Sequence, residues 1–127
     1  MTPFLVHDAT GRILRSGTCP ADHVALQARD GETAIAAHGR DDTHWVDGGA
    51  VVERPATGLP EAHTLAADAD WTVPDVPEGT AVRIDGAAMG ATDAEGLTLS
   101  FGPPGRGVVE LAPPFPWRPA RCVVIVE

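Results

Sequence analysis

The sequence contains no lysine, no asparagine and no tyrosine, so all nine of its basic side chains are arginines. Because the codons for these three residues are AT-rich, their absence indicates a gene from a GC-rich genome. Positive charge is also scarce, since nine basic side chains stand against eighteen acidic ones and give a formal net charge of -9. Nucleic acids and anionic membrane surfaces bind through basic patches, so both are poor partners for this chain.

Long apolar runs and a signal peptide are also lacking. No stretch approaches the ~18 consecutive apolar residues that span a membrane, and no charged-then-apolar leader opens the sequence. We therefore expect a soluble protein that is made in the cytoplasm and is not inserted in a membrane.

The only cysteines are Cys19 and Cys122. They allow one disulfide, but two buried thiols are the favoured interpretation.

At 127 residues the chain has room for one domain or two very small ones. The first part predicts a hairpin that turns near Gly11, a short helix capped by Thr18 or Cys19, and a second hairpin at "DGG" (residues 47–49). The stretch "PATGLPEAH" has two prolines, a glycine and no periodicity, which is typical of a linker. We predict an N-terminal module over residues 1–54, a linker over 55–63 and a C-terminal domain over 64–127.

The C-terminal part predicts strands only. In "TAVRID" Val82 and Ile84 alternate with polar residues, and in "LTLSF" Leu97, Leu99 and Phe101 do the same. Several short strands separated by Gly- and Pro-rich turns are typical of a small antiparallel β-sandwich of Ig-like type. The predicted fold class is therefore mainly β, with an α+β hairpin module before this sandwich.

The last predicted strand, "RCVVIVE", is apolar on both faces. Cys122, Val124 and Val126 point one way, whereas Val123 and Ile125 point the other way. A strand of this kind is expected to be buried on both faces. In so small a domain, the second cover comes either from another chain or from the linker or N-terminal module. Val123 and Ile125 are therefore candidate partner-contact residues.

The segment "PPFPWRP" is a second candidate contact, because Phe115 and Trp117 alternate with prolines there. An exposed, stiffened aromatic pair is suited to stack on a partner protein or on a sugar. The alternative, which we favour, is that both rings plug the end of the sandwich.

Signatures of catalysis and metal binding are weak. The stretch "GRDDTHWVDGG" (residues 39–49) gathers Asp41, Asp42, His44 and Asp47, but its spacing fits neither an EF-hand loop nor a zinc site. We interpret it as turns. The two serines lie outside a G-x-S-x-G elbow, and no Gly-rich stretch opens a helix that would hold phosphate. We expect no enzymatic activity, no cofactor and no metal site.

Three stretches of the chain are similar to a known group of proteins: "DATGRILRSGTCP", "DDTHWVDGGAVVERP" and "FPWRPARCVVIVE". Together they resemble small proteins encoded in the tail gene clusters of tailed bacteriophages and prophages of GC-rich proteobacteria. The resemblance covers most of the chain and is most specific over residues 42–55, where Trp45 holds a position that is usually aromatic. Its motifs are structural, so it implies no active-site residues. It implies a virion component of the tail or tail fibre, made in the host cytoplasm and oligomeric in the assembly.

Three function classes remain open on this basis. The first is a non-enzymatic structural or adaptor subunit that contacts other tail or fibre proteins. The second is a module that binds host-surface glycan through Phe115 and Trp117. The third is a tail-fibre assembly chaperone that is absent from the mature particle. Presence in purified particles separates the first two classes from the third, and glycan binding separates the second from the first.

Overall fold

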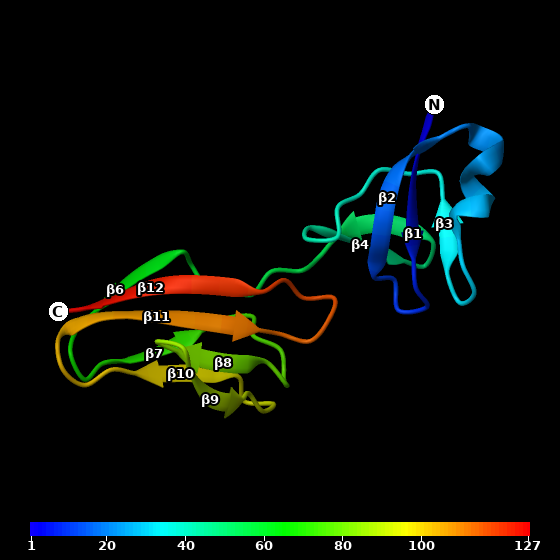
Figure 1. Ribbon diagram of the computed structural model, residues 1–127. Coiled ribbons are helices and arrows are strands. Elements are labelled where there is room, and N and C mark those ends of the chain that lie inside the picture. The colour runs from blue at the N-terminus through cyan, green and yellow to red at the C-terminus, as the bar shows by residue number, and fades with distance from the viewer. The chain divides into compact units, whose positions relative to one another are not determined.

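The computed structural model describes all 127 residues and divides them into two compact units, Met1–Arg54 and Pro55–Glu127. Both units are built from short β-strands with one helical segment in the first (Figure 1). The predicted mainly-β fold class is confirmed. None of the helical structure is long and apolar enough to cross a membrane. Cys19 and Cys122 are both free and buried, one in each unit.

The first unit is centred on a three-stranded antiparallel sheet of order β2-β1-β3. Its strands are β1 (Thr2–His7), β2 (Ile13–Cys19) and β3 (Thr33–Ile35). The other elements are the helical segment η1 (Ala21–Gln27) and the hairpin of β4 (His44–Asp47) and β5 (Ala50–Glu53).

Strand β1 is apolar at consecutive positions because both of its faces are buried. Phe4 and Val6 pack with Val24 of η1 on one side. Leu5 packs with Val46 of the β4–β5 hairpin on the other side. Alternate residues of a strand point to opposite faces, so this unit is a sheet between two covers.

The predicted helix is present, but it differs in type and in its start. It is a 3-10 helix whose N-cap is Pro20, with no side-chain cap hydrogen bond. The predicted cap at Thr18 or Cys19 is wrong, because both residues belong to β2 and pair with β1. The Cys19 side chain is also buried in the core, where it cannot reach the helix start.

Both predicted hairpins form, and glycines set their turns. Gly11 has φ +91°, and its carbonyl accepts a hydrogen bond of 2.8 Å from the backbone N–H of Val46. A Cβ at Gly11 would overlap the Val46 carbonyl oxygen, so only glycine allows this approach. Between β4 and β5 the whole turn consists of Gly48 (φ 57°) and Gly49 (φ 85°), the positive pair that a tight two-residue hairpin turn requires.

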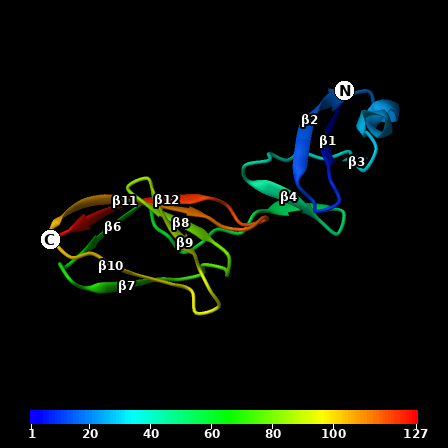
Figure 2. The same ribbon diagram turned by 60° about the horizontal axis from the view of Figure 1, so that its bottom comes forward.

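The second unit has two layers (Figure 2). One is a five-stranded sheet of order β6-β12-β11-β8-β9, and the other is a two-stranded sheet of order β10-β7. The larger sheet contains β6 (Ala62–Leu65), β8 (Ala81–Ile84), β9 (Ala87–Ala91), β11 (Gly105–Ala112) and β12 (Ala120–Val126). The smaller sheet contains β7 (Asp70–Val73) and β10 (Leu97–Ser100). All pairs are antiparallel except β6–β12, which is parallel.

The core of the second unit lies between the two sheets. Every strand except β9 contributes to it, and its buried members are Leu65, Val73, Val82, Leu97, Leu99, Val109, Leu111, Cys122, Val124 and Val126. The inward positions predicted for "TAVRID" and "LTLSF" are therefore confirmed. The rings of His63 and Trp71 stack at 3.9 Å between centroids and join β6 of one sheet to β7 of the other. Burial in this core raises the pKa of the Cys122 thiol, which is consistent with a cysteine that contributes to packing.

Residues 55–63, predicted as a linker, form part of the second unit. Backbone hydrogen bonds of 2.8–3.0 Å join Pro55, Gly58 and Glu61 to Arg118, Pro74 and Val123. The last two residues of the segment, Ala62 and His63, already belong to β6. The absence of periodicity in the sequence reflects irregular backbone that is nevertheless hydrogen-bonded, which a local pattern does not reveal.

Candidate interaction surface

Strand β12 has one buried face and one open face. Cys122, Val124 and Val126 point into the core, so Val123 and Ile125 lie on the outer face of the five-stranded sheet. Val123 is half-buried and Ile125 is 42% exposed. The expectation that the strand is buried on both faces is met only for the inner face, because no strand of the second unit lies over the outer one.

The neighbouring strand β11 extends the apolar area on this outer face. Val108 is half-buried, points outward and pairs directly with Val123. One step further along the strands, Ile125 pairs with Arg106. We call Val108, Val123 and Ile125 the apolar strip. It crosses two central strands of the sheet and is open to contact by another surface.

A row of charged side chains lies next to the apolar strip. Glu110 of β11 pairs with Arg121 of β12 on one side and with Arg83 of β8 on the other. All three are exposed, and none makes an ion pair or side-chain hydrogen bond within the chain. We call Arg83, Glu110 and Arg121 the charged row. Because neither arginine has a partner within the chain, both guanidinium groups of the charged row are available to a ligand.

The charged row borders a shallow depression of about 480 Å³ on the same face. Small residues provide much of the lining, namely Ala81, Ala112, Pro119 and Ala120. Arg83 of β8 and Arg121 of β12 also line it. The arrangement is suited to hold groups that carry negative charge, since guanidinium pairs well with carboxylate.

The charges of the second unit are unevenly distributed. Pro55–Glu127 contains four arginines and ten acidic residues, so it is acidic as a whole. Three of those four arginines, Arg83, Arg106 and Arg121, lie on the outer face of the five-stranded sheet. The opposite outer face, on the two-stranded sheet, instead has Asp70 bonded to Ser100 and a hydroxyl pair between Thr72 and Thr98. The only arginine-rich face of this unit is therefore the one that carries the apolar strip.

The two aromatic candidates do not join this surface. Trp117 is half-buried and lines a depression of about 370 Å³ with Val73, Val76 and Leu97, at the end of the sandwich where β7 ends and β10 begins. Phe115 is half-buried in the same loop between β11 and β12. Val123 and Ile125 thus lie on the outer sheet face, whereas Trp117 lies at the sandwich end and Phe115 in the loop that carries Trp117.

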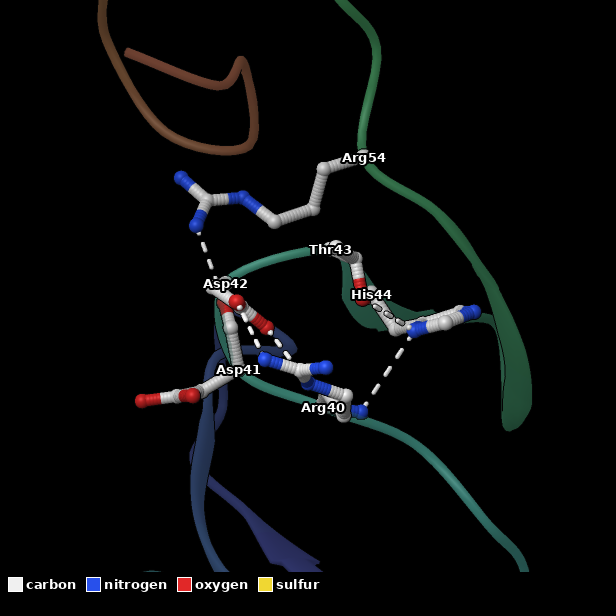
Figure 3. Close-up of polar contacts among 6 residues, drawn as sticks. All are labelled: Arg40, Asp41, Asp42, Thr43, His44 and Arg54. Carbon is white, nitrogen blue, oxygen red and sulfur yellow. Dashed lines mark hydrogen bonds and ion pairs between the residues drawn. The ribbon is translucent and has the colours of Figure 1, made fainter.

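The acidic stretch of the first unit forms a turn (Figure 3). The guanidinium of Arg40 donates to both carboxylate oxygens of Asp42, at 3.1 and 2.8 Å. Asp41 contributes its backbone carbonyl to Arg54 at 2.9 Å, and its carboxylate points away from the other side chains drawn. The turn is closed by the backbone N–H of His44, which donates to the Arg40 carbonyl at 2.7 Å.

The remaining members of that stretch are also engaged in local structure. The Nδ1 atom of His44 lies 2.7 Å from the Thr43 hydroxyl. Asp47 is exposed at the end of β4, where the hairpin turn begins. No group of three or more His, Cys, Asp or Glu side chains converges in a way that could hold a metal ion. The stretch therefore has the geometry of a turn followed by a hairpin.

The charged row was not found by sequence reasoning. Each of its members occupies a polar position in an alternating strand, which indicates exposure but does not say which exposed residues are neighbours. That information is in the register between β8, β11 and β12, which local sequence does not specify.

Comparison with protein-family models, curated proteins and solved structures found no significant match to this chain.

Proposed function

We propose that this chain is a non-enzymatic structural or adaptor component of a phage tail and that it acts through protein–protein contacts. The observation that carries the proposal is the apolar strip on the outer face of the five-stranded sheet. Val123 and Ile125 lie on an interior strand of the sheet that buries Cys122, Val124 and Val126 on its inner face, and yet their own face is open. The phage setting comes from the sequence motifs that resemble small tail-cluster proteins.

The energetics favour a partner on this face. Full burial of a valine or isoleucine side chain contributes roughly 1.5–3 kcal/mol, of which the free chain obtains only a part at Ile125. An apolar sheet face rimmed by polar residues is typical of interaction sites. Small virion proteins gain stability by assembly, because a partner that binds only the folded state stabilises it.

We also infer that the second unit has an Ig-like topology. In that fold the second and fifth strands pair in one sheet, and the third, sixth and seventh lie together in the other. Counting from β6, the β10-β7 sheet and the β12-β11-β8 run follow this order, with β9 as the extra strand found in variable-type domains. The arrangement leaves the outer face of the larger sheet as a broad, regular surface for contact.

Glycan binding is a second candidate function, and Trp117 is the observation that favours it. Its half-buried ring lines a depression at the sandwich end, where an aromatic face can stack on a sugar ring. A Trp117→Ala variant that loses binding to host surface glycan, while the apolar strip is intact, would support this candidate over the first.

The proposed function is tested by combining Val123→Asp with Ile125→Asp. We expect the isolated double variant to fold, because neither side chain belongs to the buried core. In a phage that encodes it, the variant should no longer be incorporated into particles, as judged by mass spectrometry of purified virions. Thr98→Asp is the control, because it places an aspartate on the outer face of the other sheet, and it should be incorporated.

Two outcomes contradict the proposal. If the wild-type chain is never found in purified particles, the structural role fails and an assembly chaperone takes its place. If the double variant is incorporated as well as the Thr98→Asp control, the outer face of β12 is not the contact surface.

A further inference from the structure

We propose that the outer face of the five-stranded sheet binds an extended acidic segment of a partner protein, with the pattern acid-x-apolar-x-acid. One carboxylate pairs with the arginines of the charged row, the apolar side chain packs on the apolar strip, and the second carboxylate pairs with Arg106. This inference rests on the proposed contact function and adds the chemistry of the partner.

The spacing of rows on this face gives the pattern. Along β12, Arg121, Val123 and Ile125 are two residues apart and point to the same side. The antiparallel strand β11 repeats this spacing in the opposite direction. Its outward residues pair with those of β12 as Glu110–Arg121, Val108–Val123 and Arg106–Ile125. Positions two residues apart in a strand lie about 7 Å apart. A second extended chain has the same repeat. Its alternate residues can therefore lie over successive cross-strand pairs of β11 and β12.

The charged row selects for carboxylates that approach from its ends. Neighbouring strands are about 4.8 Å apart, so the Cα atoms of Arg83 and Arg121 are separated by roughly 10 Å. Glu110 stands between them and repels a compact anion that would sit midway. A carboxylate on a flexible side chain is able to pair with either guanidinium while avoiding Glu110, and the small floor of the depression leaves room for it.

The same face favours a protein over an acidic glycan. Apolar side chains at the centre with arginines at the margin are typical of protein interfaces. A sugar ring is usually held by an exposed aromatic side chain, and the strands β6, β12, β11, β8 and β9 contain no aromatic side chain other than the inward-facing ring of His63. Three of the four arginines of this acidic unit also lie on this one face, so an acidic segment meets most of the unit's positive charge there.

The test uses the full-length chain and a capped pentapeptide of sequence glutamate-serine-valine-serine-glutamate. Titration is followed by NMR through the side-chain Nε–H resonances of Arg83, Arg106 and Arg121. We expect these resonances to shift, with binding that weakens as salt is raised. The same peptide with glutamine at both ends should not bind. Arg83→Gln and Arg121→Gln should each weaken binding about two- to fivefold, the range of exposed ion pairs.

The control variant is Arg118→Gln, which removes the one arginine of the second unit outside this face and should leave binding unchanged. Equal loss in Arg118→Gln would show nonspecific attraction and overturn the proposal. Equal binding of the glutamine peptide, or no binding of either peptide, would overturn it as well. Oligogalacturonate that binds more tightly than the glutamate peptide would assign the face to an acidic glycan instead. None of these results depends on incorporation into particles, so failure here is distinguishable from failure of the proposed function.

Discussion

Val124 and Ile125 are consecutive residues of β12, yet Val124 is completely buried whereas Ile125 is 42% exposed. The difference arises because one side chain enters the core between the two sheets and the other lies on the outer face of the larger sheet. The strand thus contributes both to folding and to the surface proposed for contact.

We predict that aspartate has opposite consequences at these two positions. Val124→Asp places a carboxylate in the core without a partner, which costs several kcal/mol, and should unfold the second unit. Ile125→Asp should leave the thermal unfolding temperature close to that of the wild type. Circular dichroism of the two purified variants checks the prediction, and unfolding of Ile125→Asp would place that side chain in the core.

A second prediction concerns the turn between β4 and β5. Gly48 and Gly49 both have positive φ, where a β-branched side chain is strongly disfavoured. Valine at either position should destabilise the first unit by about 1–2 kcal/mol, measured by urea unfolding. Gly48→Asn is the matched control, because asparagine tolerates this conformation, and it should be nearly neutral. A double valine variant with unchanged stability would show that the turn is not formed as described.

A third prediction concerns the buried backbone N–H of Thr80, the residue before β8. Thr80 is fully buried, and its backbone N–H donates to the hydroxyl of Thr92 at 3.0 Å. Thr92→Val leaves this N–H without an acceptor and should cost about 1–3 kcal/mol of stability. Thr98→Val loses only an exposed hydroxyl contact with Thr72, so it should have little effect. Equal stability of the two variants in urea unfolding would contradict the assignment.

Acid should destabilise the first unit through its ionised carboxylates. The guanidinium of Arg15 donates to both oxygens of Glu32, at 2.6 and 3.3 Å, and this pairing holds the pKa of Glu32 below its usual value of 4.5. The hydrogen bond from the Thr10 hydroxyl likewise lowers the pKa of Asp8. A carboxyl whose pKa is lowered by folding stabilises the fold above its unfolded pKa, and this contribution is lost as the pH falls through the folded pKa.

Arg15→Gln isolates the ion-pair part of this effect. The variant should bring the pKa of Glu32 back toward its usual value, so the stability of the first unit should depend less steeply on pH below about 4.5. Thermal unfolding of both proteins from about pH 7 to about pH 2 provides the measurement. Parallel curves would mean that Arg15 does not set the acid dependence.

A fifth prediction concerns the N-terminal boundary of the second unit. Because residues 55–63 are hydrogen-bonded to the sandwich, a fragment of residues 55–127 should unfold cooperatively, as seen by denaturant titration. A fragment of residues 64–127 lacks these bonds and the first half of β6, so it should be clearly less stable. Equal stability of the two fragments would restore the interpretation of residues 55–63 as a free linker.

The sequence was most informative where strands alternate or glycines mark a turn. The inward positions Val82, Leu97 and Leu99 and the turn at Gly48 and Gly49 were all predicted from local pattern and observed in the structure. The mainly-β class followed from the same signals. These features depend on the pleat and on backbone sterics, which are local properties.

The features missed by sequence reasoning depend on distant partners or on weak local preference. The first half of strand β6 was assigned to the linker, because the place of this strand is set by parallel pairing with β12 rather than by its own composition. Strand β9 is rich in alanine and glycine, residues that disfavour strands, and forms because it pairs with β8. The charged row of Arg83, Glu110 and Arg121 requires the register of three strands at once.

The position of β12 between β6 and β11 has a consequence for synthesis on the ribosome. The elements of the first unit precede all those of the second, so the first unit is able to fold while later residues are still being added. Strand β6 is made early but pairs in its sheet only with β12, which follows every other strand. Until β12 emerges, β6 and the apolar inner face of the sheet stay exposed, and the nascent second unit is open to chaperone binding and aggregation.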